Sequence, residues 1–557
     1  MIDKTTEPNG STDTEQRSWL PLTAISLAMF SVVLDSTMMN VAVGAIAKDL
    51  NTWVVGVQSA ISLYSLVMAS LMLTGGKLGD IRGAALIFRV GCVVFGIGSL
   101  IAAFSPNLGV LILGWSIIEG IGAAMILPMA MVLIFANYDG AQRVAAFGIW
   151  GGVQASGAAL GPMLGGFLTS YLTWRLGFGM HVVIMGAAFL SARSMREPQR
   201  NREARLDIVG TVISSLGLAT IVLGFLLAGR YGLVEARREF KLGGTTIDLL
   251  GFSPTPVLVV IGLAILVGFA HWQRHVSRSG GTPLLRLDIL RNSRFMSCVT
   301  TDTLRQLALA GVLFIVPVFT QSALGFSAIQ SGLAVLPFSV MVFVLSMTTA
   351  GLGERVAPKW LMLGGLGAFW AGLVLLRSVV SATMGIGDFV VPLGVMGLGI
   401  GLFVAQIVNV TISQVDDDQR NEGAGTHNTF RELGSSLGTA VIGAILLTGL
   451  FSNLSGGLLR AEGIAARDTD RQELAVALED ANEQVAPADG DKAIDALPPA
   501  EQAEFVGLVE AAQVDAMKDA VTWTAGFVLL GILVATFLPG NRKEEERPEP
   551  EPRALLK

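Results

Sequence analysis

Two acidic residues lie near the middle of long apolar runs, where a carboxyl group can exchange a proton. Asp35 lies within residues 20–43, and Glu119 lies within residues 109–135. A charge at the centre of a lipid bilayer costs about 2.5–3.5 kcal/mol on insertion scales, so such residues rarely occur there by accident. An apolar environment also favours the neutral carboxyl group, so that proton binding competes with the binding of a cation. We therefore predict proton and substrate binding at both residues; a structural, hydrogen-bonded role is the alternative.

Four further polar residues are candidates for the same site: Asn40, Ser116, Asp302 and Arg305. Ser116 lies three residues before Glu119, so one face of an α-helix would carry both side chains towards a central cavity. Asp302 and Arg305 are also three residues apart and are expected to pair across one helical turn. For this pair we expect a structural role before a functional one.

Four other polar residues are expected to be structural or interfacial. His181 stands alone near the end of a predicted membrane span, where a histidine is usually structural. Glu422, Arg431 and Glu432 lie around the start of the span predicted at 426–451, and we expect them at the membrane interface.

Long apolar blocks carry these residues and fix the fold class. The chain has 557 residues, of which 52% are hydrophobic and 15% are charged, whereas a soluble protein carries roughly 25% charged residues. A helix needs about 20 apolar residues to cross a bilayer. About fourteen blocks reach that length, near residues 20–43, 56–76, 85–104, 109–135, 144–169, 174–195, 206–229, 253–273, 296–321, 330–352, 359–380, 388–413, 426–451 and 520–539. The sequence therefore predicts an all-α polytopic membrane protein.

The composition disfavours several classes of function. The two cysteines, Cys92 and Cys298, lie in apolar surroundings, so we expect neither a disulfide framework nor a metal site. No glycine-rich nucleotide-binding loop is present, which argues against direct ATP coupling. The polar residues 1–18 lack the order of a cleaved signal peptide, so the first span is expected to be retained. We expect no enzymatic activity, no cofactor and no nucleic-acid partner.

The basic residues predict the orientation in the membrane. Two loops carry clusters of arginine: Arg193, Arg196, Arg200, Arg202 and Arg205, then Arg274, Arg278, Arg286, Arg291 and Arg294. The positive-inside rule places these loops in the cytoplasm, and an even number of spans places both termini there. The loop after span 206–229 opposes this pattern with four basic residues, which three acidic residues partly offset. We expect a multi-pass protein of the inner or plasma membrane.

A weak internal repeat predicts two bundles of six helices. Leu-Gly-Asp at 78–80 and Leu-Gly-Glu at 352–354 each follow the second helix of a half, a recurrent transporter design. The predicted regions are a cytoplasmic tail at 1–18, a bundle at 19–195, two inserted helices at 206–273, a bundle at 295–540 and a cytoplasmic tail at 541–557. Residues 453–519 form an acidic insert, expected outside the cell as short amphipathic helices. It is either a solvated segment or an element that gates or binds a partner.

The stretch GVQASGAALGPMLGG at 152–166 gathers residues that are poor helix formers. Three glycines recur every four residues and form a smooth stripe along which helices approach closely, and a proline bends the helix. The residues of the stretch are Gly152, Gly157, Gly161, Pro162, Gly165 and Gly166. Their spacing resembles the antiporter motif of the major facilitator superfamily, which in that family marks proton-coupled exporters. Generic helix packing is the alternative explanation.

Three other segments resemble the fourteen-span drug:proton antiporters of this superfamily. The segment LDSTMMNVAV at 34–43 is similar to their first-span motif, with Asp35 and Asn40 at its polar positions. The segments TWRLGF at 173–178 and TQSALGFSAIQSGLAVLP at 320–337 are similar to two of their loops. The resemblance covers the chain except the insert and the tails.

The segment GGKLGDIRG at 75–83 resembles the signature loop of the family, which forms a cytoplasmic charge latch between helices. The latch residues would be Gly76, Asp80, Arg82 and Gly83. Isoleucine replaces the usual arginine after the aspartate, and two alanines replace the usual basic pair. The resemblance therefore implies a weaker latch, in which Arg82 and Arg89 act as substitutes.

The fourth span also departs from the family. Ser116 takes the position of the usual arginine, and Glu119 takes that of the usual glutamine. This puts arginine-dependent proton coupling in doubt and adds a second carboxyl group within the membrane.

The resemblance implies a function as well as a fold. It implies a monomeric, proton-coupled antiporter that exports amphipathic, often cationic, drugs or toxic compounds by alternating access. The proton gradient would drive export without another cofactor, and the partners would be the substrate, protons and the lipid bilayer. Two alternatives stay open: export or flipping of a native lipid or metabolite, and a non-transporting membrane scaffold.

Overall fold

The computed structural model describes residues 18–197, 205–238, 240–242, 245–247, 251–348, 356–416, 420–461, 471–478 and 498–539. Both predicted tails lie outside these residues, apart from Ser18 in the first tail. The second member of the predicted repeat, at 352–354, also lies outside them.

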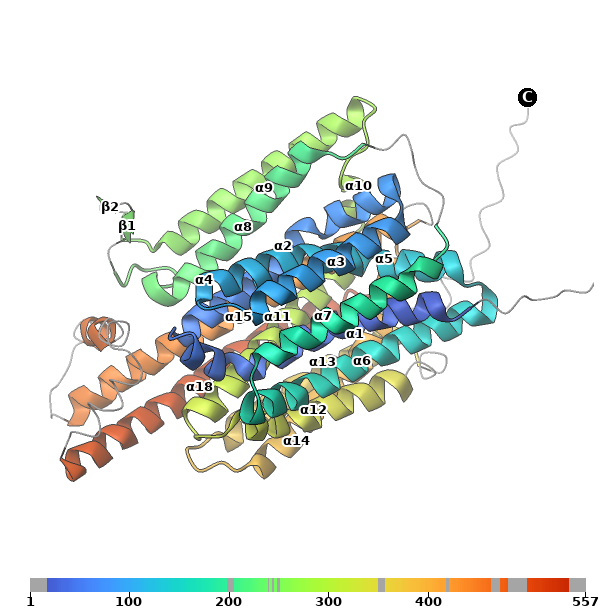
Figure 1. The fold of residues 1–557 in the computed structure, drawn as a ribbon. Coiled ribbons are helices and arrows are strands. Elements are labelled where there is room, and N and C mark those ends of the chain that lie inside the picture. The colour runs from blue at the N-terminus through green and yellow to red at the C-terminus, as the bar shows by residue number, and fades with distance from the viewer. Residues whose placement is uncertain are drawn as a thin grey trace, which may run out of the picture.

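The first part of the chain forms a bundle of long helices (Figure 1). Its elements are α1 (Leu20–Asp49), α2 (Val54–Arg82), α3 (Ala84–Ala103), α4 (Leu108–Leu111), the π-helical segment η1 (Ile112–Glu119), α5 (Gly120–Asn137), α6 (Gly140–Tyr171), α7 (Arg175–Ser191) and the 3-10 turn η2 (Ala192–Ser194). Helix α1 packs against α6 and α7, and α3 packs against α5 and α7. These contacts surround the predicted polar residues of α1 with helices from the same bundle.

The last part of the chain forms a second bundle. Its elements are α11 (Ser293–Ser322), α12 (Ala328–Thr348), α13 (Pro358–Val379), the 3-10 turn η4 (Ile386–Phe389), α14 (Val390–Ile412), α15 (Arg420–Ala461) and α18 (Pro499–Ala535). Helix α14 packs against α12 and α13, while α11 packs against α15 and α18. The two bundles meet along two seams, where α6 lies on α12 and α2 lies on α15.

A helical hairpin lies between the two bundles in sequence and outside them in space. Helices α8 (Ile208–Tyr231) and α9 (Pro254–Arg278) run side by side, and α8 contacts α2 and α15 (Figure 1). Helix α8 therefore covers the seam formed by α2 and α15, and α9 packs on α8. The short helix α10 (Leu287–Arg291) then leads into the second bundle.

The loop of this hairpin adds two very short strands to an otherwise helical chain. Strands β1 (Phe240–Leu242) and β2 (Thr245–Ile247) pair antiparallel, with Phe240 opposite Ile247. Their aromatic and β-branched residues favour extended backbone. The prediction of an all-α fold did not include this small hairpin.

Thirteen of the described helical segments are long and apolar enough to cross a membrane. Helix α6 is not among them, although it is 32 residues long, packs against α1 and α12, and matches the span predicted at 144–169. With α6, the described helices correspond to the fourteen predicted blocks.

The glycine stripe of α6 lies where two neighbouring helices approach it. A methyl group added at Gly157 would lie 3.2 Å from the carbonyl oxygen of Phe30, and one added at Gly161 would overlap the side chain of Thr37. A methyl group at Gly166 would lie 2.7 Å from the carbonyl oxygen of Ala328 in α12. The stripe therefore packs against α1, and Gly166 beside it packs against the second bundle, as small residues allow.

The remaining residues of this stretch fit the same arrangement. Gly165 lies against the backbone of Met38 in α1, and the carbonyl group of Pro162 lies against Gly332 in α12. Pro162 lies inside the helix. Gly152, one turn before the stripe, accepts a hydrogen bond of 2.8 Å from Ser156 Oγ.

Residues 471–478 of the acidic insert form a short helix, as expected. The ends of the insert differ from the expectation of short helices. Helix α15 continues unbroken to Ala461, and α18 begins at Pro499 and runs into the last span. Alanine, leucine and glutamate propagate a helix well, and proline is well tolerated at the first helical position. Residues 462–470 and 479–497 of the insert lie outside the described residues.

Candidate functional site

Asp35 is fully buried in the first bundle, where its carboxylate contacts two other helical segments. Its Oδ2 accepts a hydrogen bond of 2.9 Å from Trp115 Nε1 in η1. Its Oδ1 lies 3.6 Å from His181 Nε2 in α7 and has no hydrogen-bond partner among the described residues. One carboxylate oxygen is therefore hydrogen-bonded, and the other has no hydrogen-bond partner in the described part of the chain.

Glu119 is the second carboxyl group of this region. It ends the π-helical segment, its side chain is fully buried, and neither carboxylate oxygen has a hydrogen-bond partner among the described residues. The Ser99 hydroxyl lies nearby, but it donates to the Phe95 carbonyl at 3.0 Å. Glu119 interacts electrostatically with Asp35, so the structure brings the two predicted residues into one site.

Segment η1 can bring Glu119 close to the neighbouring helix α3 because α3 has a glycine, Gly98, at the point of contact. A methyl group added at Gly98 would lie 2.5 Å from the Glu119 backbone nitrogen. The expected α-helical face of Ser116 and Glu119 is wrong in one respect, since the segment is π-helical. Short π-helical insertions occur frequently at functional sites.

Aromatic side chains enclose the two carboxyl groups. Trp115 stacks on Tyr64 at 6.0 Å between ring centroids and meets the ring of Phe178 edge-on at 5.8 Å. The rings of Phe95 and His181 also meet edge-on, at 6.0 Å. The Tyr64 hydroxyl lies near Asp35 but makes no hydrogen bond of normal geometry. This shell places both carboxyl groups in an apolar environment of low effective dielectric constant, which favours their neutral forms.

The two other predicted residues of the first bundle have different surroundings. Ser116 is fully buried and donates a hydrogen bond of 2.8 Å to the Ala60 carbonyl, which joins η1 to α2. Asn40 Nδ2 donates to the Ser36 carbonyl at 2.7 Å, while its Oδ1 has no partner among the described residues. Ser116 is thus occupied by a backbone contact, and Asn40 retains a free acceptor.

Asp302 and Arg305 pair as predicted, but in the second bundle. Arg305 Nε donates to Asp302 Oδ1 at 2.7 Å, and His427 Nε2 of α15 lies 2.8 Å from Asp302 Oδ2. Arg305 also donates to Gln306 Oε1 at 2.8 Å. The three-residue cluster of Asp302, Arg305 and His427 therefore joins α11 to α15, a contact that fits the structural role expected for the pair.

The residues predicted at the membrane interface lie in different surroundings. The backbone nitrogen of Arg286 donates to Glu422, so that residue contacts the loop before α11. Glu432 is only 7% exposed and lies within α15, 3.7 Å from Arg431 Nε. Burial of Glu432 differs from the interfacial position that the sequence predicts.

The predicted latch residues lie at the junction of α2 and α3. Gly83 has a φ of 108°, a conformation that favours glycine, and its backbone nitrogen donates to the Gly79 carbonyl at 2.8 Å. Asp80 interacts electrostatically with Lys77 of the same helix. Arg89, a proposed substitute, donates from Nε to the Ala85 carbonyl of its own helix at 3.2 Å.

The other latch residues differ in exposure. Arg82 is exposed, and Gly76 is half-buried near Pro128 of α5.

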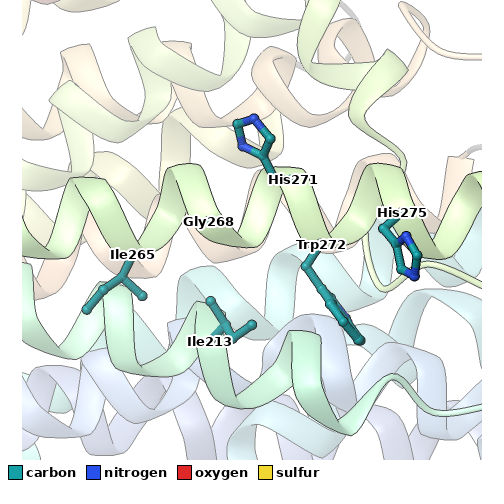
Figure 2. Close-up of a pocket in the computed structure, with 6 residues that line it drawn as sticks. All are labelled: Ile213, Ile265, Gly268, His271, Trp272 and His275. Atoms are coloured by element: carbon teal, nitrogen blue, oxygen red, sulfur yellow. The ribbon is translucent and has the colours of Figure 1, made fainter.

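One groove of about 600 Å³ lies elsewhere, on the α8–α9 hairpin. Figure 2 shows its lining residues on these two helices: Ile213, Ile265, Gly268, His271, Trp272 and His275. The Trp272 indole donates to Asp207 Oδ1 at 2.9 Å, which ties the end of α9 to the start of α8. None of the predicted site residues lines this groove.

Sequence reasoning missed two contacts of the site. The sequence predicts no role for Trp115, and it predicts His181 as an isolated structural residue near the end of a span. In the structure His181 is fully buried beside Asp35. The π-helical segment and the partner of Asp302 in α15 were also missed. No local signal marks these contacts, because their partners are far apart in sequence.

Comparisons with known proteins agree with this architecture. The family model described as Major Facilitator Superfamily matches residues 25–439. The chain is 30% identical over 436 residues to the puromycin resistance protein pur8 of Streptomyces alboniger, covering 77% of this chain and 82% of that protein. It is 26% identical over 562 residues to the tetracenomycin C resistance and export protein of Streptomyces glaucescens, covering 98% and 97%.

A solved structure gives the same result for the fold. A bacterial homologue of the human lysosomal transporter Spinster, in an inward-facing and occupied conformation, matches with a TM-score of 0.56 at 16% identity, covering 92% of this chain and 95% of that one. The family match extends over most of the chain and places it among transporters, not enzymes. The chain is a multi-pass membrane protein that belongs to the Major Facilitator Superfamily.

Proposed function

We propose that this protein is a proton-coupled antiporter that exports amphipathic, often cationic, drugs or toxic compounds. The observation that carries the proposal is the pair Asp35 and Glu119, fully buried in one bundle, with three carboxylate oxygens that have no hydrogen-bond partner in the part of the chain that the structure describes. Buried polar groups are usually hydrogen-bonded. Carboxylate oxygens left open in an apolar shell are suited to binding a proton or a cation in turn.

The names of the relatives support drugs as the substrates. They include resistance proteins for puromycin and tetracenomycin C, the second also named as an export protein. A cationic substrate would be attracted to an ionised carboxylate, more strongly in a low-dielectric site than in water. Protonation of the same carboxylate would release the cation, which links proton entry to substrate exit without any other cofactor.

Alternating access would rock the two bundles about the buried site. Gln321 of α11 donates to the Val41 carbonyl of α1 at 2.9 Å, and Ile329 of α12 donates to Ser170 Oγ of α6 at 3.0 Å. Gln58 of α2 donates to the Thr439 carbonyl of α15 at 2.8 Å. These hydrogen bonds join the bundles near the end of α1, and they would have to break when the site opens to that side.

The orientation, location and subunit number complete the proposal. The arginine clusters of the loops support an orientation in the plasma membrane with both termini in the cytoplasm. We propose a monomer as the transporting unit. Export of a native lipid or metabolite is the alternative substrate assignment, and the experiment below distinguishes the two.

The test is gradient-driven uptake into inverted membrane vesicles. With the vesicle interior acidic, the wild-type protein should accumulate puromycin and tetraphenylphosphonium, and a protonophore should abolish accumulation. Asp35→Asn should remove the response to the pH gradient while the protein stays in the membrane. Uptake of both cations that persists in the presence of the protonophore would refute proton coupling. Uptake of labelled lipid alone would favour export of a native lipid.

A further inference from the structure

His181 is a buried histidine whose two ring nitrogens have very different surroundings. Its Nδ1 lies 2.7 Å from Ser31 Oγ of α1, a normal hydrogen-bond distance. Its Nε2 lies 3.6 Å from Asp35 Oδ1, and both of these atoms lack a hydrogen-bond partner among the described residues. The histidine and the aspartate thus face each other through their two open atoms.

The chemistry of imidazole explains how an added proton would stabilise the contact between His181 Nε2 and Asp35 Oδ1. A neutral histidine carries one N–H donor and one lone-pair acceptor. When Nδ1 donates to Ser31, the Nε2 lone pair faces an ionised carboxylate oxygen, and two acceptors repel each other. One added proton converts this contact into a hydrogen bond, whichever of the two atoms carries it.

Neighbouring side chains hold His181 and Asp35 in this facing arrangement. Trp115 holds the other carboxylate oxygen of Asp35. Phe95 and Phe178 meet the imidazole ring edge-on, with ring centroids 6.0 and 6.4 Å away. Neither side chain can turn without breaking a hydrogen bond or moving an aromatic ring, so the facing geometry is fixed by packing.

The titratable groups around His181 offer no competing cation. Among the described residues of α1, α3 and α6, which pack against α7, these groups are Asp35, Lys48 and Asp49 of α1, Arg89 and Cys92 of α3, and Tyr171 of α6. Tyr64 of α2 and Glu119 of η1 interact electrostatically with Asp35. Arg89 is bound to the Ala85 carbonyl of its own helix, and Asp49 is bound to Trp174 and Arg175. In the tautomer that donates from Nδ1, a proton therefore supplies the positive charge that this contact lacks.

We propose that His181 is a positioning residue that shares the transported proton with Asp35 and thereby sets the pH range of transport. The inference rests on the proposed proton-coupled export. His181 would disfavour the ionised carboxylate through its lone pair and stabilise the protonated pair through the new hydrogen bond. In this proposal the Ser31 hydroxyl accepts from Nδ1–H, one of the two roles that a hydroxyl can take at this distance. A midpoint that moves to higher pH in the His181 variants would indicate the other tautomer, in which Nε2–H donates to Asp35, and would overturn the inference.

The experiment measures binding of tetraphenylphosphonium to the purified full-length protein between pH 5 and 9, together with gradient-driven uptake into inverted vesicles. His181→Phe keeps an aromatic ring between Phe95 and Phe178 but removes the lone pair. We expect the midpoint of cation binding to move to lower pH by about one unit, a tenfold loss of proton affinity. His181→Asn is the second variant, and it should shift the midpoint in the same direction.

Two controls make the result specific. His271→Asn removes an exposed histidine of the outer hairpin, whose Nδ1 lies 2.9 Å from the Val267 carbonyl of its own helix, and it should keep the wild-type midpoint. Asp35→Asn should remove the pH dependence altogether. If the folded His181 variants keep the wild-type midpoint while Asp35→Asn loses it, the inference about His181 is wrong and the proposed function stands. If Asp35→Asn itself keeps the wild-type profile, the proposed function fails, and this inference fails with it.

Discussion

The indole nitrogen of Trp115 donates a hydrogen bond of 2.9 Å to Asp35 Oδ2, although the two residues are 80 positions apart in the chain. This contact joins the π-helical segment to α1 inside the first bundle. It places a single neutral donor on a buried carboxylate, so it stabilises the ionised form of Asp35 without supplying a charge.

Trp115→Phe should therefore shift the pH midpoint of cation binding in the opposite direction from the His181 variants. A hydrogen bond to a charged group contributes about 1.5–3 kcal/mol, and one pH unit corresponds to about 1.4 kcal/mol. Loss of the donor makes the ionised carboxylate less stable, so the midpoint of tetraphenylphosphonium binding should rise by about one to two pH units. Trp272→Phe is the matched control, because Trp272 donates to Asp207 in the outer hairpin. An unchanged midpoint in Trp115→Phe would show that the indole does not affect Asp35.

Glu119→Gln should weaken export of cations more than export of neutral compounds. The substitution removes a negative charge but keeps nearly the same volume, and charge attracts a cation strongly where the dielectric constant is low. Uptake of tetraphenylphosphonium and of its uncharged analogue triphenylphosphine oxide should be compared in the same vesicles. Equal effects on both compounds, or no effect on either, would assign Glu119 a structural role and leave coupling to Asp35 alone.

Gly161→Leu should abolish transport while the protein still inserts into the membrane. Any side chain at this position overlaps Thr37 of α1, and overpacking of a tight contact costs about 1–3 kcal/mol. Gly161→Ala should lower the melting temperature and reduce uptake less severely. The control is Gly151→Ala in the same helix, where an added methyl group meets no atom within 4 Å. Wild-type uptake by a well-expressed Gly161→Leu protein would contradict the packing argument.

Asp302→Asn should destabilise the protein without moving the pH midpoint of cation binding. The substitution leaves Arg305 buried without its charged partner, and breaking a buried ion pair from one side costs about 3–5 kcal/mol. The double variant Asp302→Asn with Arg305→Met should recover part of the lost thermal stability. A midpoint shift with unchanged stability would instead make Asp302 a second proton site.

Cysteine labelling tests the proposed orientation. Glu504 near the start of α18 and Ser279 at the end of α9 are both exposed, while the natural Cys92 and Cys298 are buried. A membrane-impermeant maleimide should label Glu504→Cys in intact cells and Ser279→Cys only after permeabilisation. The reverse pattern would overturn the positive-inside assignment and, with it, the direction of export.

Features that depend on residues close together in the chain could be predicted from the sequence. Apolar blocks of bilayer length predicted the helices, because backbone groups in lipid must be paired within each span. The spacing of Gly157, Gly161 and Gly165 predicted a close helix contact, and the structure places α1 against them. The three-residue spacing of Asp302 and Arg305 predicted their ion pair. Each of these follows from the helical repeat alone.

The partners of the buried carboxyl groups depend instead on how the helices pack together. Trp115 and His181 reach Asp35 from two other helical segments, and His427 reaches Asp302 from α15. The π-helical turn that carries Glu119 likewise depends on the close packing of α3 at Gly98. Contacts between distant residues depend on how whole helices pack, and helical periodicity fixes which face is buried but not which helix covers it. The sequence could therefore name Asp35 and Glu119, whereas packing alone supplied the indole and the imidazole that act on Asp35.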